Sequence, residues 1–473
     1  MNSRWLMSSV VVQVVVTMGG CANPGDVIGK DDGVTVRWSA VTAPTVIKLG
    51  ALDDPGTTPA YGNAIRLAVK QMNQALSTGH DNVQFSVSFG DDHGNVPAIA
   101  RSETLRLLND EHVLAMVSDS SGDTIQVNGL NYDPASPAPY KFPAVCYQCS
   151  NGSINDPNAT DANPVNQAAL RDTDNWLRRI FYNANFEAKV IDQIIVAKPN
   201  GGDRNGDGKL KLSIYADGGH VSLASALGPT LGLYTGLQTS IEIIFLTSQA
   251  DMPAQWARVV DNFNDTTNVP DGEPDYVVMA MLPVNVTAAV QSYRAGGFTL
   301  PIVSNNSFRR NYILPLVGPG ANGLEGSSVA LANTDLAGQM FIKAFTDEYG
   351  VGPEQTSSGA YDSVTTLMLA SLVAAHTVHG PALVTPADIR AALDQINDPH
   401  GFRVKPIAGN FEAAAQQIRV GHAVNYDGAY DNDDWNAVGD IFPPLVHWTV
   451  ENLAFVEHES YLCDPAHPLC PVQ

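Results

Sequence analysis

The sequence predicts an α/β protein with two lobes, each built on a parallel β-sheet covered by helices. From Thr45 onward, short apolar runs alternate with stretches whose apolar residues recur at helical spacing. This alternation is typical of parallel α/β folds. The chain has 473 residues, more than one hydrophobic core usually supports. Hydrophobic residues make up 44% of the chain and charged residues 16%, a globular composition.

The strand and helix predictions follow from the spacing of the apolar residues. Residues 46–51 form an apolar run, residues 61–76 place their apolar side chains on one helical face, and residues 83–89 alternate as in a half-buried strand. The same reasoning predicts strands near 113–117, 142–146, 211–215, 241–246, 276–281 and 301–303, and helices near 96–109, after His220, near 252–263 and 285–295, and as a pair within 346–377. Three insertions, 151–166, 198–209 and 425–435, interrupt this alternation, and the first of them, rich in Asn, Asp and Pro, is predicted to be a loop.

The N-terminus has the pattern of a secretory signal peptide. Arg4 precedes the apolar stretch Val10 to Met18, which is too short to span a bilayer. The following Gly19-Gly20-Cys21 is similar to the lipobox of bacterial lipoproteins, in which the cysteine is lipidated, although Met18 stands where leucine is usual. We interpret 1–21 as a lipoprotein signal peptide and 22–45 as a tether, so the protein is expected outside the cytoplasm, anchored to the membrane. An ordinary signal peptide with an incidental cysteine is the alternative.

Four cysteines remain after Cys21, as two close pairs: Cys146 with Cys149, and Cys463 with Cys470. In an exported chain such pairs indicate disulfides. A thioredoxin-like redox site at Cys146-Tyr-Gln-Cys149 is the alternative, but it requires the first thiol at a helix N-terminus. A polar loop, 150–157, follows instead.

The formal net charge of −23 excludes nucleic acid as a partner, because such binding requires a basic surface. A small-molecule site is indicated where the apolar run Val113 to Val117 gives way to the polar residues Ser118 to Asp123. Ligands of α/β proteins bind beyond the carboxyl ends of the strands, where helix N-termini offer unpaired N–H groups. Ser121 lacks a Gly-x-Ser-x-Gly elbow and an assignable base, so we predict no enzyme activity, catalytic residue or cofactor.

The order of several motifs resembles the type I periplasmic substrate-binding proteins, the family of branched-chain amino-acid receptors of ABC importers. The motifs that carry this resemblance are Ile47-Lys-Leu-Gly50 with Ala60-Tyr-Gly62, Asp91-Asp92, Ser120-Ser121-Gly122 with Thr124, Pro274-Asp-Tyr-Val277 with Arg294-Ala-Gly-Gly-Phe298, and Gly359-Ala-Tyr-Asp-Ser363. The resemblance implies two Rossmann-like lobes joined by a three-crossover hinge, with crossovers near Asn183, Thr334 and Pro406. Lobe one would comprise 46–183 and 335–405, lobe two 184–334 and 406–455, and a tail with its cysteine pair 456–473.

The resemblance also implies candidate ligand residues. In lobe one these are the Ser121 hydroxyl for a ligand carboxylate, Ser150, the Gln148 carbonyl and Tyr61, although Tyr61 would equally fill the lobe core. In lobe two, His220 replaces a family aromatic and is either a ligand contact or a capping residue. Asn306 replaces the acidic residue that pairs with the ligand ammonium, and a buried ammonium without a countercharge costs several kcal/mol. Asp119 or Asp123 would have to supply that charge, so we expect a small polar ligand rather than an amino acid specifically.

One segment is similar to the first half of a calcium-binding loop. Asp203, Asn205 and Asp207 alternate as oxygen ligands before Gly208, but Ile214 stands where the bidentate carboxylate is required. The alternative is a solvated acidic connection. Together these features favour a lipid-anchored, extracytoplasmic protein that delivers a small solute to an ABC permease. A ligand-sensing or regulatory lipoprotein of the same fold, without a transport role, is the second hypothesis.

Overall fold

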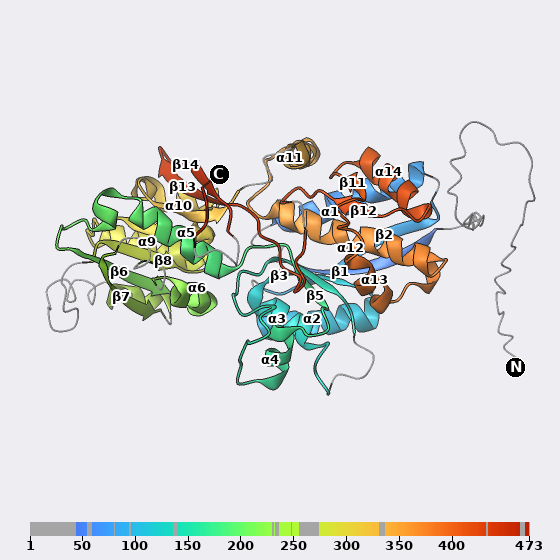
Figure 1. Ribbon diagram of the computed structural model, residues 1–473, viewed down its shortest axis with the longest axis horizontal. Helices are drawn as coiled ribbons and strands as arrows, with labels where there is room; N and C mark the ends of the chain where they lie inside the picture. Colours follow the sequence, from blue (N-terminus) through green and yellow to red (C-terminus); the bar gives the residue numbers. More distant parts are fainter. Residues whose placement is uncertain are drawn as a thin grey trace, which may run out of the picture.

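The computed structural model describes residues 44–472 apart from 54–58, 80, 94–95, 136–140, 229–230, 232–235, 247, 255–273, 331–335, 432–433 and 464–468. The predicted signal peptide, Cys21, all but the end of the tether, Thr334 and most of the helix predicted near 252–263 lie outside these residues. The described residues form two α/β lobes at opposite ends of the long axis (Figure 1). None of the helices described is long and apolar enough to cross a membrane.

Lobe one is built on a five-stranded parallel sheet in the order β2-β1-β3-β4-β5. Its strands are β1 (Thr45–Asp53), β2 (Val83–Asp91), β3 (Met116–Ser120), β4 (Ala144–Gln148) and β5 (Leu177–Arg179). Its helices are α1 (Pro59–Thr78), α2 (Pro97–Arg106) with the π-helical turn η1 (Leu107–Glu111), α3 (Ser121–Gly129), α4 (Pro164–Arg171), α11 (Leu336–Tyr349), α12 (Ser357–Thr377) and α13 (Pro386–Leu393). The apolar face predicted for α1 is buried in the main core together with α12. A second cluster on the opposite face holds α2 and α3.

Lobe two is built on a seven-stranded sheet in the order β14-β13-β10-β9-β8-β6-β7. The strands are β6 (Lys209–Ala216), β7 (Gln238–Phe245), β8 (Tyr276–Ala280), β9 (Ile302–Ser304), β10 (Glu325–Val329), β13 (Leu445–Glu451) and β14 (Ala454–Tyr461). The first five are parallel, and β13 and β14 are antiparallel to their neighbours. The helices named below are α5 (Ala184–Val196), α6 (Val221–Ala226), α9 (Pro283–Ala295) and α10 (Ile313–Val317), with the 3-10 turns η3 (Gly218–His220) and η5 (Asn306–Phe308).

The boundary expected near Pro406 is wrong. Residues 402–426 form a unit of β11 (Phe402–Val404), α14 (Ala408–Arg419) and β12 (Val424–Tyr426), which packs on α1 and α12 of lobe one. The buried carboxylate of Asp362 in α12 accepts hydrogen bonds from the Tyr426 hydroxyl (2.6 Å) and from the backbone N–H of Tyr430 (2.6 Å). The chain therefore leaves lobe one only between Asp440, which forms a bridge with Arg179 of β5, and the start of β13.

The C-terminal tail is part of lobe two. Strand β14 completes the edge of the sheet by pairing with β13. Beyond it, Gln193 of α5 exchanges two hydrogen bonds of 2.9 Å with the backbone of Cys470. A disulfide joins Cys463 to Cys470, and it closes the tail against α5.

Two further local predictions have clear outcomes. The loop predicted over 151–166 ends early, because the Asn163 side chain accepts a hydrogen bond from Val165 N (2.9 Å) and begins α4 at Pro164. Cys146 and Cys149 form a disulfide, and both are fully buried beside a non-helical turn. Burial without a helix N-terminus favours a structural disulfide over redox chemistry.

Candidate functional site

Three of the predicted ligand residues gather at the carboxyl edge of the lobe-one sheet. Ser121 opens α3 directly after β3, and Gln148 and Ser150 end and follow β4. The Ser121 hydroxyl accepts a hydrogen bond from Asn151 N (3.1 Å), which leaves its proton for a ligand. The Gln148 amide donates to Thr356 Oγ1 (2.5 Å), and the Ser150 carbonyl accepts from Ala184 N (2.7 Å) at the start of α5. The adjacent parallel strands β3 and β4 end at one edge, which brings these groups together.

Arg179 holds the loop that carries Ser150. Its guanidinium is fully buried, forms an ion pair with Asp440, and donates to the carbonyls of Cys149 (3.2 Å) and Asn151 (2.9 Å). Asp440 lies 261 residues further along the chain. Sequence reasoning missed this pair, because no local pattern connects residues so far apart.

Tyr61 is a core residue that faces the hinge. It is 7% exposed, and its ring lies edge-on to that of Tyr147 with centroids 5.5 Å apart. Burial raises the pKa of Tyr312, which follows η5 in lobe two. The positive charge of Arg310 acts to lower that pKa, and the neighbouring Tyr61 acts to raise it. Tyr61 therefore lies on the side of the lobe-one core that is closest to lobe two.

The lobe-two residues His220 and Asn306 lie at the carboxyl ends of β6 and β9, next to one another. His220 Nε2 is 3.4 Å from the Ser307 hydroxyl, and its Nδ1 is 3.1 Å from Asp217 Oδ1. Asp217 also accepts hydrogen bonds from Asn285 Nδ2 (2.9 Å) and from the backbone after β8. Burial alone would raise the pKa of Asp217, but the hydrogen bonds and the charge of His220 outweigh it and lower the pKa. His220 thus has a structural partner on each ring nitrogen, which favours a structural role over ligand contact, and it occupies the N-cap position of α6 without a capping hydrogen bond from its side chain.

Three hydrogen bonds connect the lobe-two edge with the hinge and with lobe one. Asn306 N donates to Glu187 Oε1 (2.7 Å), and the hydroxyl of Tyr182, in the first crossover, donates to Glu187 Oε2 (2.9 Å). Burial raises the pKa of Glu187 to about 8, although both hydrogen bonds act to lower it. Arg310, which is 5% exposed, donates to the Gln355 carbonyl of lobe one (3.0 Å). Glu187 and Arg310 were not singled out from the sequence, where neither stands in a recognisable motif.

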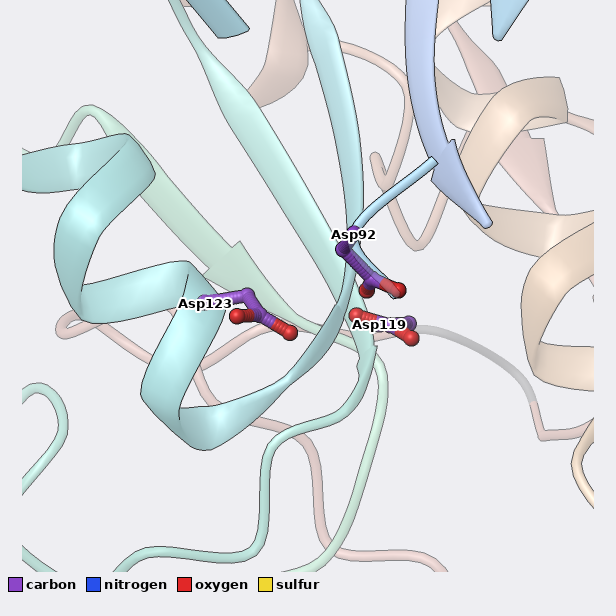
Figure 2. A group of neighbouring side chains, drawn as sticks. All are labelled: Asp92, Asp119 and Asp123. Carbon is purple, nitrogen blue, oxygen red and sulfur yellow. The ribbon is translucent and has the colours of Figure 1, made fainter. Parts of the chain in front are cut away.

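A cluster of carboxylates lies beside Ser121. Asp92 follows β2, Asp119 lies in β3 and Asp123 in the first turn of α3, and all three are buried (Figure 2). Burial, followed by the negative charges of Asp92 and Asp123, raises the pKa of Asp119 well above its usual value. Burial likewise raises the pKa of Asp123 to about 7. Asp92 belongs to an acidic pair already visible in the sequence, but its proximity to the other two depends on the strand order.

The calcium loop suggested by the sequence is closed by its own backbone. The two carboxylate oxygens of Asp203 accept hydrogen bonds from Gly206 N (2.6 Å) and Gly208 N (2.8 Å). Asp207 forms an ion pair with the buried Lys211. The structure favours the alternative of an acidic connection.

A surface cavity of about 590 Å³ is lined by residues of both lobes. Arg309, Leu314, Glu354, Gln355 and Phe455 are among the residues that line it. None of the six predicted ligand residues does. Because the cavity contains none of these residues, we place the candidate site at the carboxyl edges of the two sheets, where they lie.

No protein-family model and no curated protein matches the chain. Several solved structures are similar to it. The leucine-binding protein LivK from Thermotoga maritima superimposes with a TM-score of 0.60 at 14% identity, covering 89% of this chain and 99% of the relative. The branched-chain amino-acid binding protein LivJ from Streptococcus pneumoniae, in complex with isoleucine, gives 0.59 at 16% identity over 89% and 100% of the two chains. An ABC-transporter solute-binding protein from R. palustris, in complex with benzoate, gives 0.58 at 14% over 87% and 95%. The predicted two-lobed fold of type I periplasmic binding proteins is therefore confirmed.

Proposed function

We propose that this protein is an extracytoplasmic solute-binding lipoprotein that captures a small polar ligand between its lobes and delivers it to an ABC importer. The fold supports this proposal, since the similar structures are substrate-binding proteins of such transporters. The observation that carries it is the grouping of Ser121, Gln148 and Ser150 at the carboxyl edge of the lobe-one sheet. Closure of the lobes then requires a ligand with higher affinity for the closed state than for the open state.

The ligand chemistry follows from the groups at the two edges. The Ser121 proton and the first turn of α3 suit a carboxylate or another polar acceptor. Asn306 offers no charge to an ammonium, and its backbone N–H is already bonded to Glu187. These groups support a small polar or anionic solute and do not single out amino acids.

A thermal-shift screen of the purified protein tests this function. Amino acids, amides, short peptides and organic anions are added singly, and at least one class is expected to raise the unfolding temperature by binding the folded state only. Calorimetric titration then gives the affinity. No shift with any class would contradict solute binding, and loss of the gene without effect on uptake of the identified ligand would favour a sensing role.

Ser121→Ala is expected to weaken binding of that ligand by about 1–3 kcal/mol, because it removes a hydrogen-bond donor to a polar acceptor. The matched control is Ser102→Ala in α2, whose exposed hydroxyl donates to the Ile99 carbonyl of its own helix (2.9 Å). Calorimetry on both variants compares the two hydroxyls. Equal affinities for Ser121→Ala and the unmodified protein would remove Ser121 from the site.

Cys21→Ala is expected to move the protein from the membrane fraction to the soluble extracytoplasmic fraction, because lipidation of Cys21 is the proposed anchor. Mass spectrometry of the mature N-terminus is expected to find a diacylglyceryl-modified Cys21 in the unmodified protein. Cleavage at another residue, with an unmodified cysteine, would show an ordinary signal peptide.

A further inference from the structure

The cavity of about 590 Å³ that residues of both lobes line has the size and the wall of a small-molecule site. Such sites usually enclose about 300–1,000 Å³ within mostly apolar walls that carry a few polar groups. Here Leu314, Pro315 and Phe455 of lobe two supply apolar side chains, and Glu354 and Gln355 of lobe one supply polar ones. A molecule bound in this cavity would therefore contact both lobes.

Two buried oxygens of these polar residues have no hydrogen-bond partner among the described residues, namely Glu354 Oε2 and Gln355 Oε1. Gln355 is 4% exposed, and its amide nitrogen donates to the Val329 carbonyl (3.4 Å), so the amide oxygen is the atom left without a partner. Arg310 donates to the backbone carbonyl of Gln355 (3.0 Å) and is not among the described residues that line the cavity. Native proteins leave few buried acceptors unpaired, because each one costs free energy. A ligand that donates hydrogen bonds at this wall would satisfy both oxygens.

The charges at the cavity favour a cation over an anion. Arg309 also lines the cavity, but its guanidinium forms an ion pair with Glu457 and donates to the Val329 carbonyl (2.7 Å), so its charge is already compensated. Glu354 is partly exposed, and its Oε2 has no such partner in the described part of the chain. An ammonium donates strong, charge-assisted hydrogen bonds to a carboxylate. The formal net charge of −23 attracts cations to the protein as a whole, so an ammonium is the donor that this wall suits best.

We propose that this cavity is a second small-molecule site, which binds an organic ammonium with an apolar body. The ammonium donates hydrogen bonds to Glu354 and Gln355, and the apolar body packs against Leu314, Pro315 and Phe455. None of the six ligand residues predicted at the sheet edges takes part. Because residues of both lobes line the cavity, the bound ammonium also links the lobes at a place separate from the candidate site.

Calorimetric titration of the full chain with 2-phenylethylammonium chloride tests this site. The neutral 2-phenylethanol and the anionic 3-phenylpropionate are the matched compounds, and the ammonium is expected to bind at least about tenfold more tightly than either, because only it offers a charged donor. Glu354→Gln keeps the shape of the side chain and is expected to weaken ammonium binding by about tenfold or more, since the charged partner is lost. Glu348→Gln, at a surface pair with Lys70 in the same lobe, is the control and is expected to bind the ammonium as the unmodified protein does.

A second variant tests the location of the site independently of its charge. Ala454 is an exposed residue of β14 that lines the cavity, and a tryptophan at this position is expected to occupy the space of the ligand. Ala454→Trp is therefore expected to weaken binding of the ammonium and of the alcohol alike, and circular dichroism checks that both variants are folded. The absence of saturable heat with the ammonium, equal affinities for ammonium and alcohol, or unchanged ammonium affinity in folded Glu354→Gln or Ala454→Trp would each overturn the proposal.

Discussion

Arg179→Met is expected to lower the free energy of unfolding by about 3–5 kcal/mol, because it leaves the Asp440 carboxylate largely buried without its partner. The same change removes the donors to the carbonyls of Cys149 and Asn151. Since Ser150 lies between those residues, ligand affinity is expected to fall as well. Urea unfolding, followed by circular dichroism, measures the first effect.

The neighbouring Arg178 is a matched control for this change. Its guanidinium is also buried, but its partner Asp394 is 66% exposed and stays hydrated when the arginine is lost. Arg178→Met is therefore expected to cost clearly less stability than Arg179→Met. Equal losses in the two variants would show that packing of the arginine stem, rather than the buried charge, determines the effect.

Glu187→Gln is expected to reduce the loss of stability that the protein undergoes as the pH rises. Burial raises the pKa of Glu187 to about 8 from its ordinary value of 4.5, so the folded state favours the protonated form. The stability from this group is complete below the unfolded value and is lost as the pH rises through about 8. The loss is on the order of a few kcal/mol, and the glutamine, which cannot ionise, does not undergo it.

Thermal unfolding of both proteins between pH 5 and pH 9 measures this difference. Asp123 and Asp362, whose pKa values burial raises to about 7, also lose stability in this interval. The informative quantity is therefore the difference between variant and unmodified protein at each pH. Glu348→Gln, at a surface pair with Lys70, is the control and is expected to follow the unmodified protein. A Glu187→Gln curve parallel to that of the unmodified protein would contradict the assignment.

The elements of the fold were predictable where each one buries its own apolar residues. The strand before Asp53, the helix from Tyr61 to Leu76 and the helix after the Gly350 turn show periodicities that depend only on neighbours in the chain. The helix before that turn was placed wrongly, since it spans Leu336–Tyr349 and lies almost entirely before the predicted segment 346–377. The placement of residues 402–440 did not follow from periodicity. It depends on Asp362, which accepts hydrogen bonds from Tyr426 and Tyr430 more than sixty residues away.

The candidate site, too, was predictable from the sequence only in part. The sequence alone located the polar turn at Ser121 and the residues Gln148 and Ser150, because strands of a parallel sheet end at a common edge and polar residues after a buried strand mark that edge. The three-dimensional arrangement was needed to bring Asp92 next to Asp119 and Asp123, and to pair Arg179 with Asp440. These contacts join segments that share no local pattern, since buried charges and hydrogen bonds depend on distance in space rather than along the chain.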